Sequence, residues 1–362
     1  MLKIKLKGEE LSVPEGTRVI DLVKEEEKCN YSVCRIGAQV KELNYRLTAK
    51  NDGAAIELLG LENIEGGKAY EASLRFITAM AFYKLYPEVK IRFSYNVSRA
   101  IFCQAVEGEV NMSRIADEVK AEVKRIIKEN LPIERVTVSL DEAREIYARF
   151  GYADKMEMLK YRPENTVHLY KCGGFYDYLN AYMVPSTGCI KNYRITPYSP
   201  GLIIQYPRYE LGAQIPEFVE ESTYGRTLQK IYRWSKKANL QTVADINRKV
   251  ENGEMLEFVQ MCEARHNDML SDLGDAIESD IENIRLVGIA GPSSSGKTTF
   301  CNRLRIELLS RGINPVMISM DDYYLEKAKI AEIQKVPLSE IDLERIEYWD
   351  YDVKVDKKLI AE

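Results

Sequence analysis

The pattern of apolar and polar residues changes from strand-like to helix-like several times along the chain. Residues 2–6 alternate between aliphatic side chains and lysines, which predicts a strand with one buried face. The apolar run over residues 74–85 is too long for an ordinary strand and stops just before Pro87, so it predicts a helix. Residues 112–129 place aliphatic side chains three and four positions apart, which predicts an amphipathic helix. A mixed α+β protein follows from these patterns.

The last third of the chain has a different order of elements. Residues 226–283 are helical and charged, without the Gly/Ser composition of a flexible linker. An apolar strand over 284–290, a glycine-rich turn, a helix and a second strand over 315–320 then follow. In a parallel α/β sheet the carboxyl ends of both strands would open into one crevice.

These patterns predict a multidomain protein with α+β and α/β parts. Residues 1–62 form a small β-grasp (ubiquitin-like) unit, and residues 63–225 form a larger α+β domain. Residues 226–283 form a helical connector, and residues 284–362 form an incomplete parallel sheet.

Composition narrows the class of protein. The chain has 362 residues, 45% hydrophobic and 30% charged, with a net charge of −5. This balance is that of a soluble globular protein and argues against a large nonspecific nucleic-acid surface, although a local basic patch stays possible. No apolar run is long enough to cross a membrane, and the chain begins with a strand pattern and not a signal peptide. We expect a cytoplasmic protein without a membrane partner, and its oligomeric state is left open.

The cysteines are scattered and form no C-x-x-C pair. We expect buried or free thiols in a reducing compartment, with neither a disulfide framework nor a zinc site. They are Cys29, Cys34, Cys103, Cys172, Cys189, Cys262 and Cys301.

Residues 291–298 fit the pattern G-x-x-x-x-G-K-[ST], and they come directly after the predicted strand over 284–290. Backbone N–H groups of such a turn can surround a phosphate chain at the start of a helix. Lys297 would reach the β- and γ-phosphates, and the Thr298 hydroxyl would bind Mg²⁺. The cofactors predicted from this motif are therefore ATP and Mg²⁺. The predicted ATP-binding residues are Gly291, Ser293, Ser294, Ser295, Gly296, Lys297, Thr298 and Thr299.

A carboxylate follows the second predicted strand. If both strands lie in one parallel sheet, Asp321 is near the phosphates and can accept a proton from an attacking hydroxyl group, with Lys297 as the second catalytic residue. The alternative is that Asp321 and Asp322 cap the next segment or lie behind the Mg²⁺ ligands.

The C-terminal part resembles the uridine kinase and phosphoribulokinase family. The resemblance rests on G-P-S-S-S-G-K-T-T at 291–299, I-S-M-D-D-Y-Y at 318–324 and the later W-D at 349–350. It implies ATP-dependent phosphorylation of a nucleoside 5′-hydroxyl, with Asp321 as the base. By the same resemblance, Tyr323 and Tyr324 would line a nucleoside pocket. Asp350 would hold the ribose hydroxyls, with Asp352 as a competitor for that role.

This resemblance is to a larger domain than the sequence contains. The stretch from Gly291 to Glu362 is shorter than a P-loop kinase domain of ~150 residues. The resemblance therefore describes a parent protein, and we expect little or no turnover from this chain itself.

The N-terminal parts resemble two other domains. V-P-E-G-T at 13–17, together with the strand and helix pattern, resembles the TGS domain. Residues 66–225 resemble the editing domain of threonyl- and alanyl-tRNA synthetases, through L-Y-P at 85–87, D-E-A-R-E at 141–145, and F-Y-D-Y and M-V-P within 175–185.

The editing-domain resemblance also implies a loss of chemistry. Alignment on these motifs places Ala72, Phe76, Leu179 and Met183 where the family has its histidines and cysteine. None of these four side chains can bind a metal or act as a general base. We expect the editing fold without zinc and without deacylase activity.

Other functions remain open. One alternative is an RNA- or tRNA-binding or nucleotide-sensing protein whose kinase half is vestigial, with weak RNA contact through the N-terminal domains. Another is a P-loop kinase for a different small hydroxyl substrate. The tyrosine-rich stretch 193–209 could stack on bases, although packing in a sheet is the better interpretation. A GTPase-like switch is disfavoured, because residues 291–362 contain no N-K-x-D motif.

Overall fold

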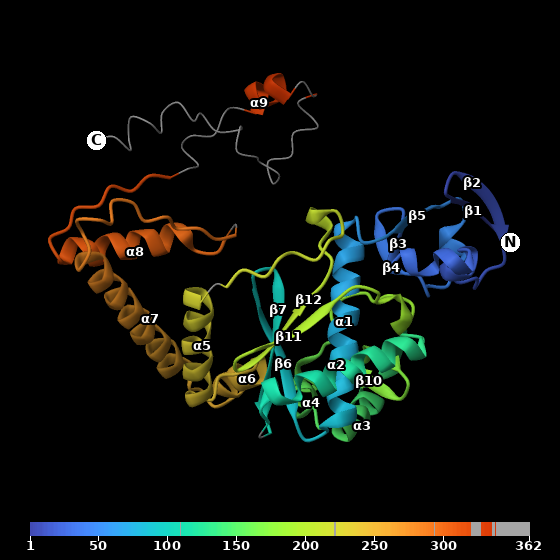
Figure 1. Cartoon of the computed structure of the whole chain (residues 1–362), viewed down its shortest axis with the longest axis horizontal. Helices are drawn as coiled ribbons and strands as arrows, with labels where there is room; N and C mark the ends of the chain where they lie inside the picture. Colours follow the sequence, from blue (N-terminus) through green and yellow to red (C-terminus); the bar gives the residue numbers. More distant parts are fainter. Residues whose placement is uncertain (109, 221, 293, 320–326, 335–336, 338–362) are drawn as a thin grey trace. The chain divides into compact units, whose positions relative to one another are not determined.

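The computed structural model describes the chain except residues 109, 221, 293, 320–326, 335–336 and 338–362, and of a few further residues only the backbone (Figure 1). The chain divides into two compact units, Met1–Arg248 and Lys249–Glu362. The four domain boundaries expected from the sequence stay a prediction.

The first unit begins with a five-stranded sheet. Its order is β2-β1-β5-β3-β4, with β1 antiparallel to β2 and parallel to β5. The alternation predicted for residues 2–6 is confirmed, since Leu2, Ile4 and Leu6 are buried and the lysines between them are exposed. The strands are β1 (Leu2–Leu6), β2 (Glu9–Val13), β3 (Val33–Ile36), β4 (Gln39–Glu42) and β5 (Ala55–Leu59), with 3₁₀ turns η1 (Val19–Leu22), η2 (Glu25–Asn30) and η3 (Ala49–Asn51) between them.

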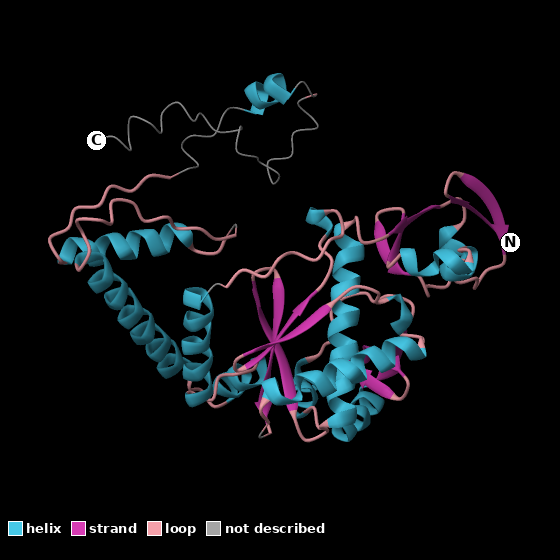
Figure 2. Cartoon of the chain, viewed as in Figure 1, coloured by secondary structure: helices cyan, strands magenta, loops and turns pink. Residues whose placement is uncertain are grey.

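The larger part of this unit is built around two long helices. Both helix predictions are confirmed: α1 spans Ile64–Leu85 and α2 spans Met112–Glu129. Their buried faces share one hydrophobic core with a four-stranded sheet of order β11-β12-β7-β6 and a three-stranded sheet of order β10-β9-β8 (Figure 2). The strands are β6 (Lys90–Val97), β7 (Ala100–Glu107), β8 (Glu134–Ser139), β9 (Thr166–Cys172), β10 (Phe175–Asp177), β11 (Arg194–Tyr198) and β12 (Gly201–Gln205). The shorter helices and turns are α3 (Leu140–Phe150), α4 (Ala153–Met158), η4 (Leu159–Tyr161), η5 (Thr187–Cys189) and η6 (Tyr209–Leu211).

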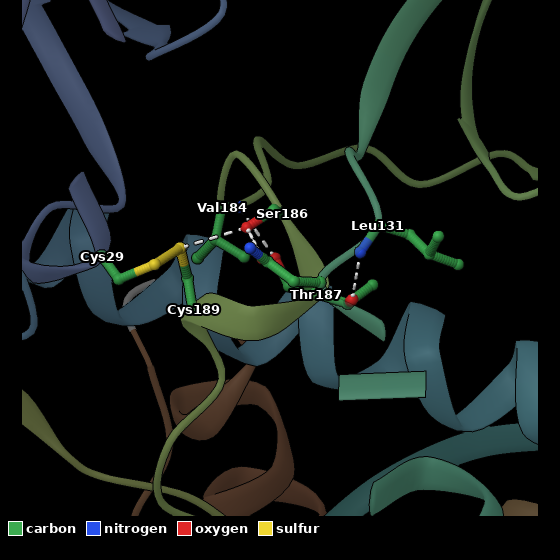
Figure 3. The surroundings of a disulfide bond; sticks show 8 residues. Cys29, Leu131, Val184, Ser186, Thr187 and Cys189 are labelled. Carbon is green, nitrogen blue, oxygen red and sulfur yellow. Dashed lines mark hydrogen bonds between the residues drawn. A yellow bond between two sulfur atoms is a disulfide. The ribbon is translucent and has the colours of Figure 1, made fainter. Parts of the chain in front are cut away.

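A disulfide joins Cys29 in η2 to Cys189 in η5, across 160 residues of sequence (Figure 3). The prediction of free thiols is therefore wrong for this pair. The fold brings together two cysteines that lie far apart in sequence, and their spacing along the chain carries no sign of this. The remaining five cysteines are free, as expected.

Helices dominate the rest of the described chain. They are α5 (Ser222–Lys237), α6 (Val243–Glu251), α7 (Met255–Glu278), α8 (Lys297–Ser310) and α9 (Lys327–Gln334). No helix within the described residues is long and apolar enough to span a membrane.

The two strands expected on either side of α8 are not formed. Residues 284–290 and 315–319 have no strand structure, and Figure 2 draws both segments as loops. Several of their apolar side chains are exposed, including Leu286 and Val316. An apolar run becomes a strand only if a neighbouring strand accepts and donates its backbone hydrogen bonds, and no described residue does so here. The expected parallel sheet is therefore absent from the described residues.

Candidate functional sites

The glycine-rich turn of the second unit leads into α8. Gly296 has a φ of 86° and precedes the first helical residue, Lys297. A β-carbon would strain this left-handed conformation, which explains why the motif has a glycine at this position. A β-carbon on Gly291 would lie 2.7 Å from the Ser295 hydroxyl oxygen, so a larger residue here would displace the Ser295 side chain or the turn.

Lys297 folds back over the turn. Its Nζ donates hydrogen bonds to the carbonyl oxygens of Gly291 and Pro292, both at 2.9 Å. The ammonium group thus lies above the loop, where it can face an anion bound at the start of α8. The first backbone N–H groups of a helix lack intrahelical partners, so this turn offers both a charge and free donors.

Packing against α7 holds α8 in place. Leu304 and Leu308 of α8 are buried against Leu270 and Ile277 of α7. Arg311, just after α8, donates hydrogen bonds to the carboxylates of residues 275, 278 and 307. The helix that positions the loop therefore has its own core, although the described residues contain no strand beneath it.

The structure brings together only part of the site expected from the sequence. Gly291, Ser294, Ser295, Gly296, Lys297, Thr298 and Thr299 lie in the turn and the first turn of α8. Five other predicted site residues lie outside the described residues: Ser293, Asp321, Tyr323, Tyr324 and Asp350. In the described part of the chain, no three His, Cys, Asp or Glu side chains lie together as a metal site would require. Mg²⁺ binding by Thr298 and the absence of zinc stay predictions.

A second candidate site is the region of the first unit that resembles an editing site. Ala72 and Phe76 on α1 and Met183 from the later loop belong to one buried core, and Leu179 packs against it. The Phe76 and Phe175 rings have centroids 5.1 Å apart. All four positions thus contribute to one hydrophobic core, and apolar side chains occupy them.

Polar groups of α1 hold the loops that follow β10. The Ser73 hydroxyl donates to the Ala69 carbonyl at 2.7 Å and accepts from the Val184 N–H at 2.9 Å. The Tyr70 hydroxyl donates to the Asn192 carbonyl and accepts the N–H of the same residue. These hydrogen bonds keep both loops against α1.

A third candidate site is a basic face on α5. Arg226, Lys230, Arg233 and Lys237 recur at intervals of four, three and four residues, so they lie along one face of this helix. All four are exposed, and α5 contains no Asp or Glu. The row is about 16 Å long at 1.5 Å per residue. From the sequence, this stretch was expected only as part of a charged helical connector. The i, i+4, i+7, i+11 spacing of the basic residues in the sequence could have predicted this basic face.

Comparisons with known proteins point to one group of enzymes. The chain is 31% identical over 200 residues to a threonine–tRNA ligase of Clostridium kluyveri, which is 53% of this chain and 30% of that protein. A ligase of Bacillus velezensis is 31% identical over 156 residues, and one of Thermotoga neapolitana is 29% identical over 196 residues. These alignments cover 43% and 52% of this chain, and 24% and 29% of those ligases. No protein-family model matches the chain.

These comparisons contradict the prediction of a nucleoside kinase. The relatives are named threonine–tRNA ligases, and the similarity supports the synthetase-like interpretation of the sequence. The structure also removes the geometric argument for the kinase, because residues 315–319 form no strand that would carry Asp321 to the loop. The chain spans about 30% of the length of the ligases that it matches, so it is similar to one part of them.

Proposed function

We propose that this chain is an RNA-binding protein with a threonine–tRNA ligase-like part, whose second unit binds a nucleotide. The observation that carries the proposal is the 31% identity over 200 residues to a threonine–tRNA ligase. Within this proposal, the five-stranded sheet is a TGS-like β-grasp unit and the α1–α2 region is an editing-type fold. Transfer RNA is the class of RNA that the names of the relatives indicate.

The basic face of α5 is the proposed RNA contact. Four exposed cations in a row can neutralise successive phosphates of an RNA backbone, which carries one negative charge per nucleotide. A net charge of −5 over the chain makes this local concentration of positive charge distinctive. Binding at such a face would be weak in sequence preference and strongly dependent on salt.

The turn at 291–299 is the proposed nucleotide site. Its glycines allow the backbone to turn tightly, and its lysine already lies over the loop. A bound phosphate chain would replace the carbonyls of Gly291 and Pro292 as the partner of the Lys297 ammonium. ATP with Mg²⁺ at Thr298 is the ligand that this motif fits.

The proposal excludes tRNA deacylation by the editing-like part. Hydrolysis there would need an activated water and a general base, and apolar side chains occupy the four corresponding positions. A mischarged tRNA should therefore be bound without being hydrolysed.

RNA binding is tested by fluorescence anisotropy with a labelled tRNA transcript over a range of salt concentrations. The double variant Lys230→Gln/Arg233→Gln should bind more weakly. The slope of the logarithm of its binding constant against the logarithm of the salt concentration should be shallower by about 1.5. Each phosphate contact contributes about 0.7–0.9 to that slope, and the variant removes two cations. The matched control is Lys124→Gln/Lys128→Gln, which removes the same charge from the exposed face of α2. Equal losses in both double variants, or no tRNA binding at low salt, would refute the role of α5.

Nucleotide binding is tested separately by calorimetry with ATP and Mg²⁺. We expect Lys297→Ala to lose ATP binding and to keep tRNA binding. A wild-type chain that gives no heat with ATP would reject the nucleotide site without affecting the proposed RNA contact.

A further inference from the structure

The first unit contains a cavity that borders the editing-like positions, since Leu179 lies in its wall. The proposed function assigns no ligand to this cavity. Its volume is about 480 Å³, and it lies between β4, the start of α1, the β8–β9 pair and the loop over residues 178–182. Pockets for small molecules typically have volumes of about 300–1,000 Å³. The cavity is therefore large enough for one nucleotide-sized molecule.

Positive groups enter the cavity from three separate elements. Lys68 comes from α1, Arg135 comes from β8, and Arg162 follows η4. The acidic residue among the lining residues, Glu65, forms an ion pair with Arg35 at 2.9 Å. Arg35 does not line the cavity, and it also pairs with Glu57 at 2.5 Å, so the charge of Glu65 is balanced only in part.

The two arginines keep donors available. Arg162 uses its Nε to hydrogen-bond the Thr166 carbonyl at 2.9 Å, and the same Nε forms an ion pair with Glu164 at 3.4 Å. Its two terminal nitrogens have no hydrogen bond to the described part of the chain. Arg135 lies over the Tyr182 ring, with its guanidinium carbon 5.7 Å from the ring centroid. Paired guanidinium N–H groups match the geometry of phosphate oxygens.

The pKa of His168 is affected by the charges of these cations. Its Nδ1 is 2.9 Å from the Thr137 hydroxyl. Its pKa is lowered, first by partial burial and then by the charges of Arg135 and Arg162. The same positive potential that disfavours a proton on His168 favours an anion in the cavity.

The remaining wall is apolar and aromatic. Val40, Ala69, Leu179 and Tyr182 offer a surface for a flat or apolar body beside the cationic groups. We propose that this cavity binds a phosphate monoester carried on a nucleoside-sized body, with Arg135, Arg162 and Lys68 on the phosphate and Tyr182 beside the base. This site is separate from the turn at 291–299 and does not depend on the proposed function.

Calorimetry with AMP tests the proposal in the full chain carrying Lys297→Ala, so that the loop of the second unit does not contribute. We expect AMP to bind, and adenosine and inorganic phosphate each to bind at least tenfold more weakly. Arg135→Gln and Arg162→Gln should each weaken AMP binding about tenfold or more, because each removes a charge-assisted hydrogen bond. Arg149→Gln, an exposed arginine of α3 outside the cavity, should leave the affinity unchanged.

Three results would overturn the proposal. They are no AMP binding at millimolar concentration, equal affinity for AMP and inorganic phosphate, or an equal loss in the Arg149→Gln control. All three substituted arginines are outside the buried core, and thermal unfolding of each variant verifies that the fold is kept. Loss of ATP binding at the turn over 291–299 leaves these measurements unaffected.

Discussion

The free cysteines differ in how deeply their thiols are buried. Cys34 is fully buried, and burial raises the pKa of its thiol to about 12, with the charge of Glu42 as a smaller cause. Burial also raises the pKa of Cys172 to about 11 and that of Cys103 further. Cys262 and Cys301 are only partly buried. Because the thiolate is the reactive form, these two groups of thiols should differ strongly in reactivity.

We therefore predict selective alkylation of the native protein. Iodoacetamide at pH 8 should modify Cys262 and Cys301, while Cys34, Cys103 and Cys172 stay protected. A thiol with a pKa of about 12 is almost entirely protonated at pH 8, and raising the pH to 9 should leave it so. Peptide mass spectrometry measures the extent of labelling at each site, and unfolding in guanidinium provides the control in which all five react. Rapid native labelling of Cys34 would contradict its burial.

Gly291, the first glycine of the motif, can be tested by a single substitution. In Gly291→Ala, the new β-carbon would lie 2.7 Å from the Ser295 hydroxyl oxygen, so the Ser295 side chain or the turn itself must shift. We expect ATP affinity to fall about tenfold or more, because the backbone donors of the turn would no longer converge on one phosphate. The control is Gly288→Ala, where a β-carbon meets nothing within 4 Å. Calorimetry with ATP compares the two variants, and equal affinities would show that the turn tolerates the side chain.

At the scale of elements, η5 connects α2 to the segment that leads into β8. The Thr187 hydroxyl donates to the Ile126 carbonyl at 2.8 Å. It also accepts from the Leu131 N–H at 2.9 Å (Figure 3). The backbones of Thr187 and Leu131 are also hydrogen-bonded, at 2.8 Å. Thr187 is fully buried, so water cannot replace these hydrogen bonds if its hydroxyl is removed.

We predict that Thr187→Val lowers the free energy of unfolding by about 1–3 kcal/mol. The substitution keeps the shape but leaves a buried donor and a buried acceptor without their partner. Chemical denaturation monitored by circular dichroism measures the change. Thr196→Val, at an exposed position of β11, should change stability by less than about 0.5 kcal/mol. A similar change in the free energy of unfolding for both variants would mean that the buried hydrogen bonds of Thr187 do not contribute to stability.

The elements differ in how well their sequence predicts them. The helix over 112–129 is found at its predicted bounds, because its apolar stripe and its Asn111 N-cap are local signals. The strands predicted over 284–290 and 315–320 are not found in the described residues 284–290 and 315–319. An apolar run becomes a strand only if a partner strand is present. At the loop, the glycine pattern predicted the turn and the helix start, since φ at Gly296 is a local constraint. The cavity near Arg135 could not be predicted, because residues from distant segments form it only after folding.

At the scale of the whole first unit, the Cys29–Cys189 disulfide is the longest covalent constraint. It attaches η2, between strands of the five-stranded sheet, to η5, beside the α1–α2 core. The two parts also contact each other through Asn44, whose side-chain amide donates to the Ile133 carbonyl at 3.1 Å. A similar contact joins the Tyr170 hydroxyl to the Glu42 carboxylate at 3.1 Å. The sheet and the core thus have noncovalent contacts that can survive reduction.

We predict that Cys189→Ala lowers the free energy of unfolding of the first unit by about 2–5 kcal/mol. A link across 160 residues restricts the unfolded chain strongly, and its loss restores that freedom. Denaturation with and without dithiothreitol measures the effect. Reductant should destabilise the wild type by a similar amount and leave Cys189→Ala unchanged. Cys172→Ala is the control for loss of a buried thiol, and this variant should keep its sensitivity to reductant. A wild-type protein that is indifferent to reductant would show that the disulfide does not contribute to stability.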